Sequence, residues 1–567
     1  MATNLSTKTI ELRNAEAFAN SFSSELSYIF IGDSTPYVNE ASPPQIVQTP
    51  GTLSDVLNSM IALKKVTAGE VKLSVPRVDW TSNTKYMQFD NLAKTEHLIE
   101  GDASINTKPF YVMAPSTRNV YKCLSNGSGS ISTVEPTGDY STSNGVVDNT
   151  GSDGYVWKYM YNIRDSDQFV DSTFIPVPTR NYVDFTSGSN TVYSSYSIRN
   201  DTVVEGELTT IIVTYPGSGY RNFNNVRTFA FGTANTSTSD GANRTIQITG
   251  AFLSEVGLTI DQVASANMTV SGGDLFSEGT FVESVDTVRN KITLTKPVLN
   301  DSDGSVSNTI SLTTRIFVDG ITTAPEPAEA SAILGPSGAI QTANVTQFGS
   351  KYADKINVKV FGTATSNIAN LRAVISPVFG HGFDIGKDLF ANSVVAVTKF
   401  GEIDSTEGGL VPSDFSFRQI GLIRNPYKYG ANTLTASPAL AGNLVSKLDS
   451  ANANTVVRQT TKVFVSSGVS YDDSEFVFQG DSSTDYTAGG FVHRIESATL
   501  LEVNELQGEL EVGKVLVGSN SGASRVVTQI IDPSFEPKAS DLLFVDNRDP
   551  ITRTDGQAES VRLTIRF

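Results

Sequence analysis

Short stretches in which apolar and polar residues alternate recur along most of the chain. In the C-terminal string VRLTIRF, polar residues separate Leu563, Ile565 and Phe567. Such alternation predicts a β-strand with one buried face. Similar runs rich in Val, Ile, Thr, Phe and Tyr are punctuated by 45 glycines and 22 prolines, a pattern typical of sandwiches and barrels. We therefore predict a mainly β fold: a β-sandwich core with few short helices and two inserted small β domains.

Helical spacing occurs at two places near the N-terminus. In NAEAFANSFSSEL, Asn14 is a suitable cap, and Phe18 and Phe22 recur on one face. In SDVLNSMIALKKV (54–66), Ser54 is a suitable cap and two lysines stand near the C-terminal end, where the helix dipole favours cations. We predict a helix in each stretch, packed on a sheet.

The densest aromatic stretch is DGYVWKYMYNI (153–163), which holds one of the two tryptophans. Alternation along a strand places four aromatic side chains on one face. These are Tyr155, Trp157, Tyr159 and Tyr161. Because each ring can bury ~150–250 Å², this face is either a core layer of the sandwich, the interpretation that we favour, or an interface with another protein.

A second strand is predicted in FRQIGLIRNP (417–426), which ends at Pro426 because proline cannot donate to the strand ladder. Arg418 and Arg424 lie on one face of this strand. Arginine is enriched at protein interfaces and pairs bidentately with carboxylates, so both are interface candidates, with a solvated face as the alternative. Arg548, which stands between two aspartates, is a further interface candidate, with a local turn network as its alternative.

An internal repeat points to inserted modules. GELTTIIVTYPGSGY (206–220) aligns with GAIQTANVTQFGSKY (338–352), and FAFGTA (229–234) is echoed by KVFGTA (359–364). Each copy reads as a strand, a glycine turn that ends in tyrosine, and a second strand.

The domain organisation follows from the repeat and from a second glycine- and valine-rich stretch near residue 515. We predict, in chain order, a core β-sandwich part with the N-terminal helices (1–200), an inserted β domain with two repeat modules (201–375), a core part (376–454), a second inserted small β domain (455–538) and a C-terminal core strand (539–567).

Charge narrows the possible partners. The chain has 42 Lys plus Arg against 60 Asp plus Glu, a net charge of −18. A chain this acidic is repelled by phosphate backbones, so we expect no nucleic-acid partner, and a basic protein partner is favoured. The chain has no apolar run of ~18 residues, and we expect no membrane partner.

Reactive side chains form no recognisable motif. The single cysteine, Cys123, reads as a small buried hydrophobe, and the three histidines are far apart in the sequence. Nucleophile elbows, phosphate-binding glycine loops and metal-ligand spacings do not occur. We therefore predict no catalytic residue, no metal and no cofactor, although a pair of glycosidase carboxylates has no sequence signature.

Six strings occur in an order that resembles the gene-eight-type baseplate wedge subunits of T-even-like contractile-tailed bacteriophages. Besides DGYVWKYMYNI and FRQIGLIRNP, they are VPRVDW (75–80), VYKCL (120–124), FIPVP (174–178) and the ending DNRDPITRTDGQAESVRLTIRF (546–567). The resemblance covers roughly the first 180 residues, then about 376–430 and the last 25 or so. The best-known family member is much shorter and lacks counterparts to about 200–375 and 455–538.

The resemblance implies a non-enzymatic structural protein in the tail baseplate of the virion, assembled in the host cytoplasm. It implies partners as well: a second copy of the chain in a homodimer, and other baseplate wedge subunits. Such a homodimer would be a spacer that takes part in the rearrangement triggered by tail contraction. Two alternatives remain open, a receptor-binding tail fibre or spike and a carbohydrate-active protein on a β scaffold.

Overall fold

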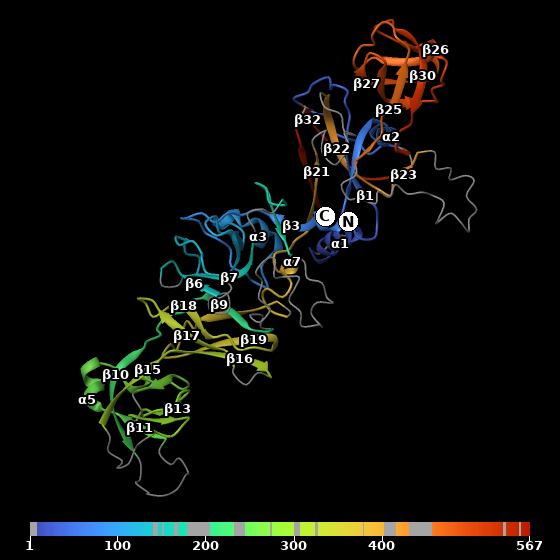
Figure 1. Ribbon diagram of the computed structural model, residues 1–567. Coiled ribbons are helices and arrows are strands. Elements are labelled where there is room, and N and C mark those ends of the chain that lie inside the picture. Colours follow the sequence, from blue (N-terminus) through green and yellow to red (C-terminus); the bar gives the residue numbers. More distant parts are fainter. Residues whose placement is uncertain are drawn as a thin grey trace, which may run out of the picture. The chain divides into compact units, whose positions relative to one another are not determined.

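The structure is a computed structural model, and its described parts form the predicted mainly β fold, with antiparallel sheets (Figure 1). The described residues are 8–139, 146–149, 152–163, 168–178, 205–231, 244–272, 275–299, 307–323, 327–377, 379–401, 415–429, 456–536, 540–554 and 557–567.

The chain divides into two compact units, which are described separately. Unit 1 comprises Met1–Val75, Gln168–Val177 and Ala391–Phe567, and unit 2 comprises Pro76–Asp167 and Pro178–Phe390. The predicted boundaries at 200/201, 454/455 and 538/539 involve residues outside the described set. The boundary at 375/376 coincides with the end of strand β20 (Asn370–Ile375).

Unit 1 contains a five-stranded sheet and a four-stranded sheet. The five-stranded order is β24 (Val456–Arg458), β2 (Met60–Val66), β1 (Ser27–Gly32), β22 (Phe415–Arg424) and β32 (Asp541–Arg553). The four-stranded order is β33 (Glu559–Arg566), β21 (Ser393–Phe400), β3 (Val71–Pro76) and β8 (Phe174–Val177). Strand β2 lies against β21, so the two sheets pack on one another.

Sequence patterns locate several of these strands correctly. Strand β33 is present as predicted, and Leu563 of its predicted buried face is buried. Ile565 is only half-buried and Phe567 lies just beyond the strand, so the second buried residue is Val561. Strand β22 ends at Arg424, directly before the predicted Asn-Pro stop. Strand β1 is buried at every position, and it pairs with β2 on one edge and with β22 on the other.

The helix predicted over 54–66 is wrong in its second half. Helix α2 spans Pro50–Ser59, and its N-cap is Thr49, whose side chain accepts the N–H of Thr52. Met60–Val66 forms strand β2, buried at nearly every position. A strand buried on both faces shows no alternation, so its apolar run was mistaken for a helical face.

The first helix is shifted relative to its prediction. Helix α1 spans Lys8–Ser21, so Asn14 lies inside the helix and does not cap it. Phe22 follows the helix directly, and the ring of Phe18 lies 5.2 Å from that of Phe567 at the chain's other end.

A closed barrel forms the C-terminal part of unit 1 (orange to red in Figure 1). Its strands in order are β25 (Thr461–Val465), β28 (Leu500–Gln507), β27 (Asp485–Ser497), β26 (Phe476–Ser482), β29 (Val515–Gly518) and β30 (Ser524–Ile531). Valine and leucine side chains from alternate positions fill its interior. Strand β23 (Tyr427–Lys428) precedes the barrel in the sequence and β31 (Phe535–Glu536) follows it, and these two short strands pair with one another.

Unit 2 begins with a four-stranded sheet and two short helices. The sheet order is β4 (Tyr111–Met113), β5 (Asn119–Asn126), β7 (Tyr155–Asn162) and β6 (Val146–Asp148), and the α-helix of this region is α3 (Thr95–Glu100). Cys123 on β5 is fully buried in this sheet's core, as predicted. Burial raises the pKa of its thiol well above the ordinary value.

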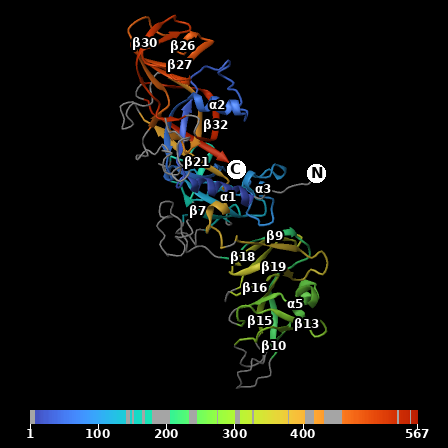
Figure 2. The ribbon, with the colours of Figure 1, turned by 90° about the vertical axis from the view of Figure 1, so that its right-hand side faces the viewer.

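The two long repeat strings lie in one six-stranded sheet, which we call the repeat barrel (Figure 2). Its order is β18 (Ile340–Gln347), β17 (Glu329–Leu334), β16 (Arg315–Thr322), β19 (Tyr352–Phe361), β20 and β9 (Leu208–Tyr215). The sheet's ends meet, because Leu208 N–H donates to the Phe348 carbonyl (2.9 Å) and Ile340 N–H donates to that of Pro216 (2.8 Å). In the repeat alignment Leu208 corresponds to Ile340, and Pro216 corresponds to Phe348. Each of the two bonds is therefore the counterpart of the other, and the barrel has an approximate two-fold symmetry.

The shorter repeat strings do not share a sheet. KVFGTA begins in β19, whereas the first half of FAFGTA lies in β10 (Phe223–Phe231) and its remainder is outside the described residues. Strand β10 belongs to an inserted module with the strand order β12 (Thr269–Ser271), β15 (Ser307–Thr313), β10, β11 (Thr245–Ile248), β14 (Lys291–Leu294) and β13 (Val282–Asp286).

The inserted module has a core of its own. Helices α5 (Gly250–Val256) and α6 (Ile260–Val263) contribute Phe252, Leu253, Ile260 and Val263 to it. The chain enters and leaves the module on paired strands, since Phe223 lies opposite Leu312.

Candidate functional site

The aromatic side chains of β7 lie in a core. Tyr155, Trp157 and Tyr161 have no exposed surface and Tyr159 has 6%. The Tyr86 ring meets Trp157 edge-on at 5.6 Å. These four residues therefore present no docking surface, and their placement is that of the core layer that we favoured.

Arg418 is bound within its own chain. Its guanidinium donates to both carboxylate oxygens of Glu40 at 2.7–2.9 Å and to the Ser34 carbonyl at 2.9 Å. Only 8% of its side chain is exposed. These bonds hold the 34–40 loop against β22, and they leave little of the Arg418 side chain accessible to a partner protein.

The other two arginine candidates differ in exposure. Arg424 donates to the Ser21 hydroxyl at 2.6 Å, and its guanidinium lies 5.5 Å from the centre of the Phe18 ring, so it anchors α1 to β22. Arg548 is 52% exposed and pairs with Asp546 at 2.7 Å, a local pair as predicted, but both residues lie inside strand β32 and not in a turn. Of the candidates, Arg548 is the one whose side chain remains half in solvent.

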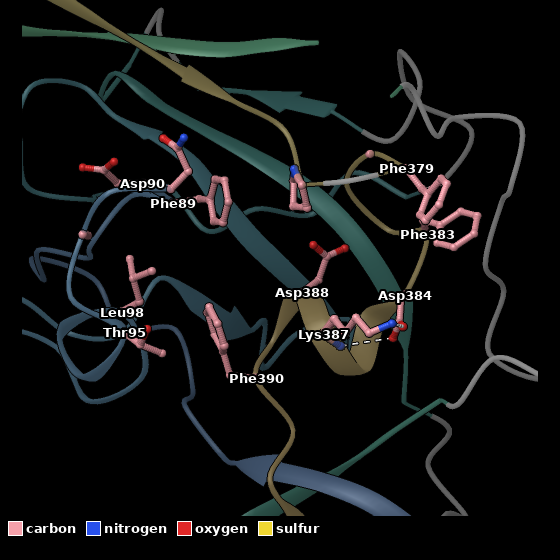
Figure 3. Close-up of a pocket in the computed structure, with 14 residues that line it drawn as sticks. Phe89, Asp90, Thr95, Leu98, Phe379, Phe383, Asp384, Lys387, Asp388 and Phe390 are labelled. Carbon is pink, nitrogen blue, oxygen red and sulfur yellow. Dashed lines mark hydrogen bonds and ion pairs between the residues drawn. The ribbon is translucent and has the colours of Figure 1, made fainter. Parts of the chain in front are cut away.

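A pocket in unit 2 was not predicted from the sequence. It has a volume of about 490 Å³ and lies between residues 89–98 on one side and Pro377 and residues 379–390 on the other, which include α7 (Ile385–Asp388) (Figure 3). Its apolar wall consists of Phe89, Leu98, Pro377, Phe379, Phe383 and Phe390. We call it the Phe379 pocket. The rings of Phe379 and Phe383 stack at 4.7 Å on one side of it.

A buried ion pair supports one wall of this pocket. Lys122 Nζ lies 2.9 Å from Asp388 Oδ1, with side-chain exposures of 0% and 2%. The ammonium also lies 3.8 Å from the centre of the Phe89 ring, and the second Asp388 oxygen accepts the N–H of Gly382. Burial lowers the pKa of Lys122, and the Asp388 charge opposes that change. These contacts fix α7 on β5.

The other carboxylates of the pocket also have cationic partners. Asp90 receives two bonds from Arg372, at 2.6 and 2.9 Å, and Asp384 pairs with Lys387 at 2.8 Å. With Lys122–Asp388, each carboxylate that lines the pocket is paired with a cation of the same chain. The pocket is therefore apolar and close to electrically neutral.

Further polar groups lie behind Phe89. The His381 ring meets Phe89 edge-on at 5.0 Å, and its Nε2 lies 2.9 Å from the Thr209 hydroxyl. Burial lowers the pKa of His381 well below its ordinary value. Burial raises the pKa of Glu207 to about 7, although Lys158 and Lys122 lower it. This cluster connects the four-stranded sheet to the first strand of the repeat barrel.

Two pocket phenylalanines have left-handed backbone conformations. The φ angle is 70° at Phe379 and 56° at Phe390. Among the described non-glycine residues with positive φ, these are the two aromatic ones, and most of the others are asparagine. Bulky residues rarely adopt this conformation, so the fold holds both rings at an energetic cost.

The remaining reactive residues are scattered. His97 pairs with Asp102 at 3.2 Å, and His493 is buried in the C-terminal barrel. Within the described residues, no three or more His, Cys, Asp or Glu side chains gather into a group that could hold a metal ion. No helix in the same set combines the length and apolarity needed to cross a membrane.

Comparison with known protein families and with curated proteins found no family model and no curated relative that matches the chain.

Proposed function

We propose that the chain is a structural baseplate wedge subunit of a contractile phage tail. The observation that carries the proposal is how the strings of the family resemblance pair. FRQIGLIRNP and DNRDPITR lie in neighbouring strands β22 and β32, and VYKCL and DGYVWKYMYNI lie in neighbouring strands β5 and β7. The resemblance thus falls on strands that form common sheets.

The segments without family counterparts support the same proposal. They form the repeat barrel, the inserted module and the C-terminal barrel, each with its own hydrophobic core. Modules of this kind enlarge the surface of a scaffold without rebuilding its sheets. A shorter wedge subunit that gained such modules accounts for both the resemblance and the extra length.

In this function the chain acts mechanically. Buried ion pairs such as Lys122–Asp388 and Arg418–Glu40 fix helices and loops on the sheets. Parts held together in this way transmit displacement to their neighbours, and paired copies form a spacer between wedge partners. An obligate dimer interface commonly buries ~2,000 Å² or more.

Two measurements test the proposal. Light scattering at micromolar concentration should give twice the chain mass of 60.7 kDa. Electron microscopy of intact tails should place the chain in the baseplate wedge. A monomer at this concentration, or a tail base that lacks the chain, would contradict the proposal, and glycan hydrolysis by the isolated chain would favour a carbohydrate-active protein instead.

A further inference from the structure

We infer that the Phe379 pocket binds an uncharged aromatic or branched aliphatic side chain that a partner polypeptide presents. The inference goes beyond the wedge function, because it assigns a binding site and a chemical class of ligand to one cavity. It depends on the pocket alone and stands independently of the homodimer and of the tail.

The electrostatics of the pocket select an uncharged ligand. Asp90, Asp384 and Asp388 each have a cationic partner within the chain, at 2.6–2.9 Å. A charged ligand would lose its hydration on entry and would compete with these pairs for a counter-charge. An apolar group loses nothing of the kind and gains from contact with phenylalanine, leucine and proline walls.

The pocket is preorganised for such a group. Phe379 and Phe390 each maintain a left-handed backbone, which is strained for a bulky side chain. The stacking of Phe379 on Phe383 and the bonds of Asp388 hold this segment in place. A cavity whose rings are already ordered costs a ligand less entropy than one that must form on binding.

The exposed apolar side chains at the rim of the pocket indicate that the ligand group belongs to a polypeptide. Phe379 is 51% exposed, and Leu92, between the lining residues Asn91 and Ala93, is 70% exposed. A small molecule inside the pocket would leave both rim side chains in water. A polypeptide that inserts one side chain covers them with its flanking residues, in the manner of an anchor residue at a protein interface.

Capped amino acids test the ligand class on the full-length chain. The probes are N-acetyl-phenylalaninamide, N-acetyl-leucinamide, N-acetyl-alaninamide and toluene, observed by saturation-transfer NMR. We expect the first two to bind with dissociation constants on the order of 1 mM and at least tenfold more tightly than the alanine probe. Equal binding of all three capped probes would overturn the inference. Toluene that binds tenfold more tightly than the phenylalanine probe would overturn the assignment to a polypeptide.

Variants test the location. Ala93→Trp adds a large side chain at the pocket wall and should weaken N-acetyl-phenylalaninamide binding at least tenfold. The control is Ala103→Trp at an exposed position outside the pocket lining, which should leave binding unchanged. Unchanged binding in Ala93→Trp would contradict the inference.

A second variant covers the case in which Ala93→Trp does not fold. Phe379→Ala removes a half-exposed ring and should keep the fold, as judged by circular dichroism, while weakening the phenylalanine probe at least threefold. Full affinity in this variant would count against the pocket. Failure of these tests leaves the wedge function standing, because mass and tail location do not depend on the pocket.

Discussion

Tyr220 and Tyr352 each bind the start of the other's repeat. Tyr220 N–H donates to the carbonyl of Gly338 at 3.0 Å, and Tyr352 N–H donates to the carbonyl of Gly206 at 3.1 Å. Their hydroxyls accept equivalent backbone bonds, from Ala369 at 2.9 Å and from Ala328 at 2.6 Å. The glycine that opens one repeat string is thus bonded to the tyrosine that closes the other.

This symmetry predicts matched effects at two glycines. A Cβ at Gly320 would lie 2.9 Å from the Tyr352 ring, and a Cβ at Gly362 would lie 2.9 Å from the Tyr220 ring. Because both rings are buried, Gly320→Ala and Gly362→Ala should each destabilise unit 2 by about 1–3 kcal/mol, measured by urea unfolding. Gly335→Ala, whose nearest neighbour would be 3.8 Å away, is the control and should change stability little.

The inserted module should be removable. Asn222 accepts the N–H of Thr314 at 2.7 Å, so the two ends of the module lie together. Replacing residues 223–313 by two glycines should leave the repeat barrel folded, with the bonds from Leu208 to Phe348 and from Ile340 to Pro216 kept. Hydrogen exchange of the β9 amides in the shortened chain measures this. Loss of their protection would show that the barrel needs the module.

Breaking the Lys122–Asp388 pair should cost far more than breaking its exposed neighbour. Lys122→Met leaves a buried carboxylate without a counter-charge, which should destabilise unit 2 by about 3–5 kcal/mol. Lys387→Met breaks an ion pair whose lysine is 62% exposed and should cost less than about 1 kcal/mol.

The double variant Lys122→Met, Asp388→Asn should recover part of that loss, because an amide still accepts the Gly382 N–H and carries no charge. Tryptophan fluorescence during urea unfolding reports on unit 2, since Trp80 and Trp157 both lie in it. Equal losses in the Lys122 and Lys387 variants would contradict the claim that burial of the Lys122–Asp388 pair makes it costly to break.

The raised pKa of Glu207 predicts that unit 2 loses stability as the pH rises. Its folded pKa of about 7 lies above the ordinary 4.5, so the folded state binds the proton more tightly than the unfolded state. Between pH ~4.5 and ~7, stability should fall by at most about 3 kcal/mol. Glu207→Gln should remove this dependence in urea titrations followed by tryptophan fluorescence. Glu205→Gln, an exposed neighbour, should retain it.

The lowered pKa of His493 predicts that the stability of unit 1 rises with pH, opposite to the dependence expected for unit 2. Burial lowers its pKa to about 4, and its ring meets Phe415 edge-on at 4.9 Å. The unfolded state therefore binds the proton more tightly, and stability should rise by about 3 kcal/mol between pH ~4 and ~6.5. It should be lost again as the pH falls through that window.

His493→Phe should flatten this slope, as followed by circular dichroism at wavelengths that report on β structure. His97→Gln serves as the control, because His97 lies in unit 2 and is 39% exposed at its side chain. A slope that persists in His493→Phe would assign the pH dependence of unit 1 to another group.

Strands with one solvated face were predictable, and buried ones were not. Alternation located β33, and the Asn-Pro pair located the end of β22. Met60–Val66 was misassigned because both of its faces are covered. The repeat strings predicted equivalent strands, but they also assigned FAFGTA to the first copy, whereas β10 belongs to the module inserted between β9 and β16.

No motif in the sequence marks the residues that line the pocket. Its walls come from residues 89–98 and from Pro377 and residues 379–390, which only the fold brings together. Lys122 was the one available hint, because a lysine inside the apolar string VYKCL needs a buried counter-charge. The identity of that partner, Asp388, depends on a contact across 266 positions of sequence. Arg418 and Arg424 were chosen for their residue type, and intrachain partners that sequence spacing does not encode now occupy them.

The two-fold symmetry of the repeat barrel also identifies a place where the barrel accommodates extra chain. Each half supplies three strands, β9, β16 and β17 in one half and β18, β19 and β20 in the other. The second half passes directly through Tyr352 into β19, whereas in the first half the module stands between Tyr220 and β16. A three-strand half therefore closes the barrel without a module, and the connection after its first strand is where a whole domain can be added without changing the barrel.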